Sequence, residues 1–179
     1  MTFLYFAYGS NMLSSRLRAR CPSAKVIGIT LARNHALEFS KKSIDGSGKA
    51  TLIENTDSIH TPGVLFEIEA VEREALDRFE GEGNGYDRVD EFSVETIDKA
   101  VTATTYLASA TQSDLLPFDW YVALVIAGGL EHELGDQYTN RLRAIQYASD
   151  EDVTRKSRVA ALEALARHGY DDHKALLRK

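Results

Sequence analysis

The sequence has almost no cysteine: Cys21 is the single one among 179 residues. An internal disulfide is therefore excluded, and one thiol cannot build a cysteine zinc site. We expect Cys21 to be a small packed hydrophobe rather than a nucleophile. The five histidines show no H-E-x-x-H spacing, and we expect His168 and His173, near the end of the chain, to face solvent. G-x-S-x-G is also missing, so neither a metalloprotease nor a serine hydrolase is supported.

Long apolar runs and an excess of positive charge are missing as well. No run approaches the roughly 18 apolar residues that a membrane helix needs. The first residues lack the basic region and cleavage site of a signal peptide. The net charge of −6 leaves no basic stripe for phosphates. We therefore expect a cytoplasmic protein that binds neither nucleic acid nor membrane. The sequence leaves the oligomeric state open, a homodimer included.

The residues that are present indicate one domain, residues 1–179, of class α+β. Apolar residues make up 44% and charged residues 27%, as in ordinary globular proteins. Strand formers predict a twisted, largely antiparallel sheet from residues 3–8, 26–31 paired with 36–39, 50–53, 63–68, and a hairpin of 89–97 with 101–107. Helical patterns predict helices at 12–20, 69–80, 117–127 (ending at Gly128-Gly129), 136–147 and 149–169. Residues 147–179 would form a helical C-terminal extension.

The opening segment FLYFAYGSNM, residues 3–12, is typical of a buried strand that enters a glycine turn and then a helix. Gly9 can adopt backbone angles closed to other residues, and Ser10 and Asn11 are preferred helix caps. Several backbone N–H groups would converge there, which favours an anionic group. The alternative is an ordinary capped strand-to-helix turn, since such caps are routine.

A second candidate is Glu80, at the end of the predicted helix 69–80. It follows Leu76 by four residues and Phe79 by one, so it extends the apolar face of that helix, whereas Asp77 lies on the polar face. A partly desolvated carboxylate in that position suits general acid–base chemistry. The alternative is a glutamate at a helix end that bends out to water.

At three places the chain resembles the γ-glutamylcyclotransferase family. Residues 3–12 match its Y-G-S-N signature. Residues 76–81, LDRFEG, with Tyr86 after them, are similar to L-D-x-x-E-G followed by a tyrosine. Trp120-Tyr121 and the segment that continues to Ile145 form the third match. The resemblance extends from residue 3 to about 147, and it implies a small β-barrel-like sheet with flanking helices.

The resemblance also implies the chemistry. Such an enzyme cyclises the γ-glutamyl group of a γ-glutamyl amino acid or amine to 5-oxoproline and releases the free amine. It needs no metal or organic cofactor, because the substrate supplies its own nucleophile. Glu80 would be the acid–base residue. The implied substrate-binding residues are Tyr5, Phe6, Ala7, Tyr8, Gly9, Ser10, Asn11, Tyr86 and Tyr121.

Two other functions stay open at this point. A family member could act on γ-glutamyl-lysine-type amines or on a γ-glutamyl-protected biosynthetic intermediate. A domain on the same fold could bind a small molecule without catalysis. Such a domain would be expected to lack the acid–base residue, whereas Glu80 is present in this sequence. Glutathione-specific relatives carry Y-G-S-L, so Asn11 disfavours glutathione itself.

Overall fold

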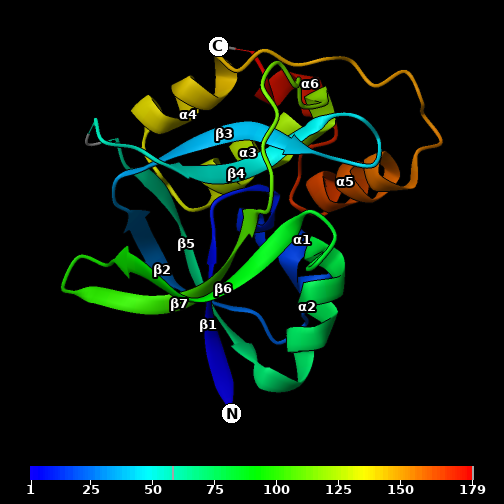
Figure 1. Cartoon of the computed structure of the whole chain (residues 1–179). Helices are drawn as coiled ribbons and strands as arrows, with labels where there is room; N and C mark the ends of the chain where they lie inside the picture. Colours follow the sequence, from blue (N-terminus) through cyan, green and yellow to red (C-terminus); the bar gives the residue numbers. More distant parts are fainter. Residues whose placement is uncertain (58, 179) are drawn as a thin grey trace.

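A computed structural model describes residues 1–57 and 59–178 as a closed barrel covered by helices (Figure 1). The order around the barrel is β1-β5-β2-β6-β7, and β3 and β4 form a separate two-stranded sheet. The strands are β1 Thr2–Ala7, β2 Lys25–Ala32, β3 His35–Lys42, β4 Gly48–Glu54, β5 Thr61–Glu69, β6 Tyr86–Glu95 and β7 Ala100–Ala108. The predicted α+β class and the largely antiparallel barrel-like sheet are confirmed.

One parallel contact closes the barrel. Tyr5 in β1 pairs with Thr104 in β7, whereas the other neighbouring strands of the barrel run antiparallel. The predicted pairing of 26–31 with 36–39 is wrong: β2 pairs with β5 and β6, and β3 pairs with β4. Strand propensity identifies strands but not their partners, because partner choice depends on burial against distant segments.

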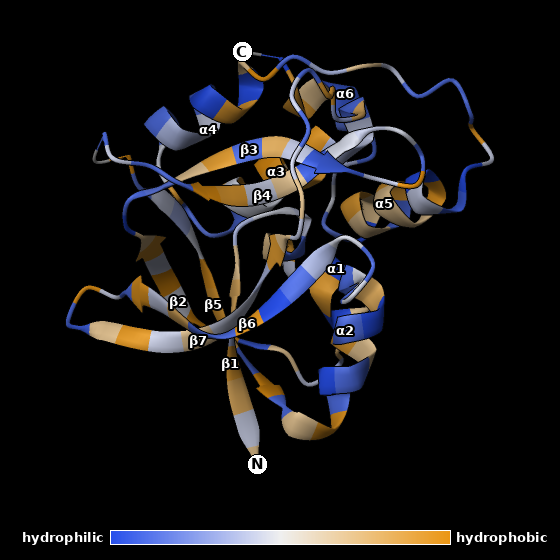
Figure 2. Ribbon diagram, viewed as in Figure 1, coloured by the Kyte–Doolittle hydropathy of each residue, from blue (hydrophilic) through white to orange (hydrophobic). Residues whose placement is uncertain are grey.

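The helices are η1 Ser10–Met12, α1 Ser14–Arg18, η2 Ala70–Glu72, α2 Arg73–Glu80, α3 Asp119–Glu131, α4 Asp136–Arg143, α5 Lys156–Arg167 and α6 His173–Leu176. Helix α3 is the central one, since its residues 119–129 are all buried. Hydrophobic colour is frequent along the barrel strands β2 and β5, whereas β6 and the outer helix α4 are largely hydrophilic (Figure 2). The predicted end of α3 at Gly128-Gly129 is wrong, because the helix continues to Glu131.

Helix α2 does not present the predicted apolar face. Val71, just before it, and Phe79 are 82% and 54% exposed, and Leu76 is its fully buried residue. Contacts with the rest of the molecule come instead from a set spaced at three and four residues, namely Arg73, Leu76, Asp77 and Glu80. The side of α2 that packs on the barrel is therefore mostly polar. The spacing of apolar residues in the sequence does not identify that side.

The C-terminal part also departs from the prediction. Helix α5 begins at Lys156 instead of near residue 149, because Asp150 is buried and accepts hydrogen bonds from Trp120 and Arg155 in a non-helical segment. His173 is half-buried, with Nε2 3.4 Å from Oδ2 of Asp119, so its predicted solvent-facing position is wrong. No helix within the described residues has the length and apolarity to cross a membrane.

Candidate active site

A small pocket lies where β1 ends, beside the C-terminal end of α2. Strand β1 delivers the turn at residues 8–11, α2 delivers Glu80, and β4, β6, β7 and α3 supply the remaining walls. The pocket has a volume of about 30 Å³. It is lined by Tyr5, Tyr8, Gly9, Ser10, Asn11, Ala50, Glu80, Tyr86, Tyr106 and Tyr121. Segments far apart in the sequence therefore meet at one place.

The carboxylate of Glu80 is held at one oxygen. Asn11 donates from Nδ2 to Oε1 at 2.5 Å, and Arg20 donates from Nη1 to the same oxygen at 3.1 Å. Arg20 also donates to Oδ1 of Asn11 at 2.9 Å, so the three side chains form a closed network. The other carboxylate oxygen of Glu80, Oε2, accepts no hydrogen bond from any residue in 1–57 or 59–178. One oxygen of an oriented carboxylate is thus left for a ligand.

Buried tyrosines form most of the wall around Glu80. The backbone of Ala50 positions two of them: its N–H donates to the Tyr121 hydroxyl at 3.2 Å, and its C=O accepts from the Tyr86 hydroxyl at 2.6 Å. Burial, and to a smaller extent the charge of Glu80, raises the pKa of Tyr5 and of Tyr121. The hydroxyls therefore stay protonated at neutral pH and can act as hydrogen-bond donors.

The turn at Gly9 to Asn11 offers backbone donors. Met12 N–H donates to the C=O of Gly9 at 3.0 Å, but among the described residues the N–H groups of Gly9, Ser10 and Asn11 have no partner. Two expectations fail here. Gly9 has φ −113°, so it needs no left-handed conformation, and neither Ser10 nor Asn11 caps a helix through its side chain. Asn11 is committed to Glu80 and to the Tyr5 hydroxyl at 3.1 Å instead.

Gly9 is required by space rather than by conformation. A Cβ at this position would lie 3.1 Å from the Cβ of Ala50 and 3.5 Å from the hydroxyl oxygen of Tyr121. The turn therefore passes directly against the two residues that shape the opposite wall. Glycine is the residue that permits so close an approach.

Most residues implied by the resemblance meet in this pocket, but two do not. Phe6 and Ala7 lie outside its lining; Phe6 is fully buried and stacks on Phe92 inside the barrel. Three contributors were missed: Ala50, Tyr106 and Arg20. None of the three carries a signal in the sequence, since each reaches the site through the folding of its segment.

Asp77 is also placed differently from the prediction. It does not face open water, because its carboxylate accepts from the Tyr106 hydroxyl at 2.6 Å and from Nη1 of Arg88 at 2.7 Å. Both carboxylate oxygens are used, in contrast to those of Glu80. Asp77 therefore fixes α2 against β6 and β7. Unlike Glu80, it has no carboxylate oxygen left for a ligand.

Neither a reactive cysteine nor a metal-binding cluster is found among the described residues. Cys21 is fully buried, and burial with the nearby charge of Glu72 raises the pKa of its thiol to about 11. This confirms a packed side chain, because a nucleophilic cysteine needs a lowered pKa. In the part of the chain that the structure describes, no three His, Cys, Asp or Glu side chains group closely enough to hold a metal ion.

A pocket with unpaired backbone N–H groups, protonated tyrosines and one half-engaged carboxylate is typical of enzymes that bind a small anionic molecule and move a proton on it. A family model for γ-glutamyl cyclotransferases, AIG2-like, matches residues 5–122. The γ-glutamylcyclotransferases of mouse and human are each 31% identical over 150 residues, which is 81% of this chain and 79% of theirs. The chain therefore belongs to the γ-glutamylcyclotransferase family.

The solved structures agree with this assignment. A γ-glutamyl cyclotransferase superposes with a TM-score of 0.81 at 26% identity, covering 91% of this chain and 99% of the other. An uncharacterized human protein superposes with a TM-score of 0.80 at 27% identity, covering 90% and 98%. Because 91% of this chain is covered, the structural match extends beyond residue 122, where the family model ends.

Proposed function

We propose that this chain is a γ-glutamylcyclotransferase that converts a γ-glutamyl amino acid or amine to 5-oxoproline and a free amine. The family assignment supports the activity. The observation that carries the proposal in this chain is the carboxylate of Glu80, whose Oε1 is held by Asn11 and Arg20 while Oε2 is open. A carboxylate held in this way can exchange a proton with a ligand without first reorienting.

The reaction needs one bond made, one bond broken and one proton moved. The α-amine nitrogen of the substrate attacks the carbonyl carbon of its own γ-amide, which closes the five-membered ring. Glu80 takes a proton from that amine and returns it to the leaving nitrogen as the amide C–N bond breaks. Electrons and protons balance within the substrate, so no co-reactant enters.

The remaining residues would bind and orient the substrate. The free N–H groups of Gly9, Ser10 and Asn11 suit either the α-carboxylate or the oxyanion that forms on the γ-carbonyl oxygen. Tyr86 and Tyr121, fixed through Ala50, would place the γ-glutamyl chain in the folded conformation that cyclisation requires. Tyr5, Tyr8 and Tyr106 complete the wall.

The location of the protein, its partners and its domain organisation are part of the same proposal. We place the protein in the cytoplasm with a small-molecule substrate and no nucleic-acid partner; the net charge of −6 and the single cysteine support this. Residues 147–179 would belong to the same domain. Contacts of α5 and α6 with α3 support that view.

The direct test is detection of 5-oxoproline by mass spectrometry after incubation with a panel of γ-glutamyl amino acids and γ-glutamyl amines. We expect 5-oxoproline and free amine in equal amounts. Glutamate released in place of 5-oxoproline would point to a hydrolase. Binding of the substrates without any product would favour the non-catalytic alternative.

A further inference from the structure

A second cavity adjoins the reactive pocket and differs from it in charge. Its volume is about 200 Å³, much larger than the pocket beside it. Both cavities share Ser10, Glu80, Tyr86 and Tyr121. The larger one adds four cationic side chains, Arg16, Arg20, Lys41 and Lys49. The larger cavity therefore offers space next to the reactive pocket for the part of a substrate beyond the scissile amide.

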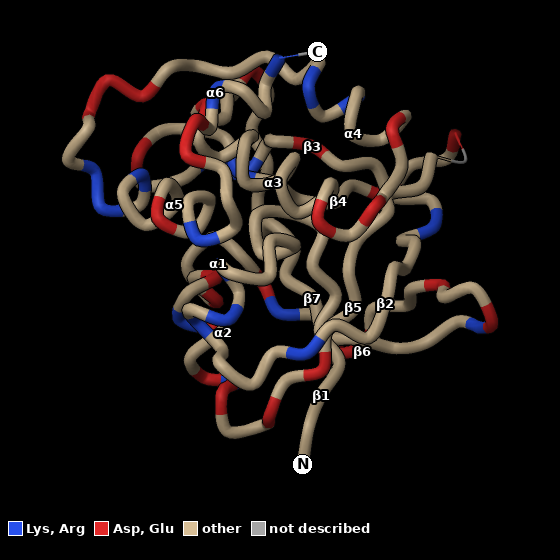
Figure 3. Tube along the Cα trace, turned by 180° about the vertical axis from the view of Figure 1, so that it is seen from behind, with Lys and Arg blue, Asp and Glu red and all other residues tan. Residues whose placement is uncertain are grey.

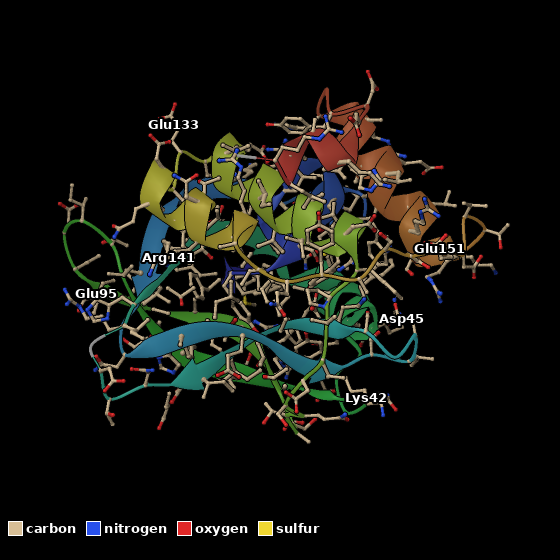
Figure 4. All side chains as sticks on the ribbon, turned by 90° about the horizontal axis from the view of Figure 1, so that it is seen from above. Lys42, Asp45, Glu95, Glu133, Arg141 and Glu151 are labelled. Atoms are coloured by element: carbon tan, nitrogen blue, oxygen red, sulfur yellow. The ribbon has the colours of Figure 1, made fainter. Side chains whose placement is uncertain are left out.

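Two of the four cations already have carboxylate partners. Arg20 pairs with Glu80 at 3.1 Å. Lys49 pairs with Asp45 at 3.1 Å, at the turn of the β3–β4 hairpin where Figure 4 labels Asp45. These two charges are balanced within the protein. They require no ligand.

The other two cations, Arg16 and Lys41, have no such partner. Arg16 donates from Nε to the hydroxyl of Ser10 at 3.2 Å, and Lys41 lies with Nζ 4.9 Å from the ring centroid of Tyr86. Within residues 1–57 and 59–178, neither forms an ion pair with a carboxylate. Burial, followed by the charge of Arg20, lowers the pKa of Arg16 to about 9, and burial lowers the pKa of Lys41. Both cations are partly desolvated, and the more distant charge of Glu80, together with that of Asp45 at Lys41, offsets only part of this cost.

The two come from different elements. Arg16 is on α1, whose basic residues lie next to α2 in the view from behind (Figure 3), and Lys41 is on β3. They therefore line the same cavity from separate segments, and one ligand with two anionic groups can engage both. The α-carboxylate of the γ-glutamyl part does not need these cations, because the free N–H groups of Gly9, Ser10 and Asn11 in the smaller pocket can bind it.

We propose that the preferred leaving group is an acidic amino acid, whose two carboxylates pair with Arg16 and Lys41. This inference rests on the proposed function and narrows it. A neutral amino acid supplies one carboxylate and leaves one cation unpaired. An uncharged amine leaves both unpaired, and a cationic amine adds a like charge to the cavity.

The experiment compares kcat/KM for γ-glutamyl-glutamate, γ-glutamyl-alanine, γ-glutamyl-propylamide and γ-glutamyl-lysine linked through the side-chain amine. We expect the values to fall from the glutamate compound to alanine and again to propylamide. A charge-assisted hydrogen bond contributes roughly 1.5–3 kcal/mol, so each step is expected to cost roughly 10- to 100-fold. Equal values, or a preference for propylamide or the lysine compound, would overturn the proposal.

Two neighbouring lysines provide a matched pair of variants. Lys41→Gln is expected to lower the ratio of kcat/KM for the glutamate compound over propylamide by roughly tenfold or more, mainly through KM. Lys42→Gln removes an exposed lysine one position along the same strand and is expected to keep that ratio. An unchanged ratio in Lys41→Gln, or an equal fall in Lys42→Gln, would refute the role of the cavity.

Failure of the proposed function would be visible separately. If none of the compounds yields 5-oxoproline, the cyclotransferase proposal fails, and calorimetric dissociation constants of the same compounds for the wild-type chain then test the cavity. Tighter binding of γ-glutamyl-glutamate than of γ-glutamyl-propylamide, lost in Lys41→Gln, would support it. Equal dissociation constants would overturn it.

Discussion

At the scale of single residues, the central feature is the unequal use of the two Glu80 oxygens. Glu80→Gln keeps the acceptor for Asn11 and removes the group that exchanges a proton. Because general acid–base catalysis contributes roughly 10²- to 10⁴-fold, we expect kcat to fall by at least about 100-fold. Steady-state release of 5-oxoproline measures this loss, with thermal unfolding as the check on folding.

Glu82 provides the control for that variant. It is exposed and lies two residues further along, beyond the helix end at Gly81. Glu82→Gln is expected to stay within about tenfold of the wild type, roughly 1.4 kcal/mol in the barrier. A dead Glu82→Gln enzyme, or an undiminished rate in Glu80→Gln, would move the proton transfer away from Glu80.

Gly9 leads to a second prediction at this scale. Gly9→Val places branched methyl groups against Ala50 and the Tyr121 hydroxyl, where even a Cβ is tight. The turn must then retreat from the opposite wall, and a misplacement of about 1 Å can cost roughly 100-fold in rate. We expect a folded protein by circular dichroism with kcat/KM reduced by about that factor. Gly9→Ala should lose less, since a single methyl demands a smaller shift, and near-normal turnover by Gly9→Val would contradict the close-contact argument.

At the scale of elements, the approach of α3 to the turn after β1 positions the site. A Cβ on Gly128 would lie 2.6 Å from the Cβ of Met12 and 2.7 Å from the backbone N of Leu13. This contact explains why a glycine stands inside the helix. It also connects α3 directly to the 3₁₀ turn that carries Asn11.

The adjacent glycines give a matched prediction. Gly128→Ala is expected to lower the free energy of unfolding by roughly 1–3 kcal/mol through overpacking. At Gly129 the nearest atom to a new Cβ, on Leu142, is 3.8 Å away. Gly129→Ala is therefore expected to raise the free energy of unfolding by up to about 1 kcal/mol, the usual helix preference of alanine over glycine. Urea unfolding of both variants measures the difference, and equal effects would refute the packing explanation.

At the scale of the whole molecule, Asp150 joins the C-terminal segment to the core. It is buried, accepts from the indole Nε1 of Trp120 at 2.9 Å and from Nε of Arg155 at 2.7 Å. Asp150→Ala leaves these donors without their acceptor and is expected to lower the free energy of unfolding by roughly 1–3 kcal/mol. Asp150→Asn retains an acceptor and is expected to lose less.

Trp120 is the single tryptophan, so its fluorescence reports this junction during urea unfolding. We expect one cooperative transition that coincides with the loss of helix measured by circular dichroism, as one domain requires. Two separated transitions would mean that residues 147–179 unfold on their own. An unchanged midpoint in Asp150→Ala would mean that the buried contact contributes nothing.

Residue type and spacing are sufficient to predict the local features. The strand at residues 3–8, the 89–107 hairpin and the helix that ends at Glu80 follow from residue type and spacing, because propensity and periodicity act over short segments. The signature at residues 3–12 and the LDRFEG segment identified the family and the pocket residues they contain. Glu80 was selected on the premise of an apolar helix face, which the exposure of Phe79 contradicts, although the carboxylate does point inward.

Features that depend on contacts between distant segments are visible in the folded chain alone. The pairing of β2 with β5, the continuation of α3 through Gly128 and the engagement of Asp77 by Tyr106 are set by segments far away in the chain. The cavity lined by Arg16 and Lys41 arises in the same way. Neither residue type nor spacing encodes which buried surfaces meet, since that choice is fixed by the free energy of packing the whole chain.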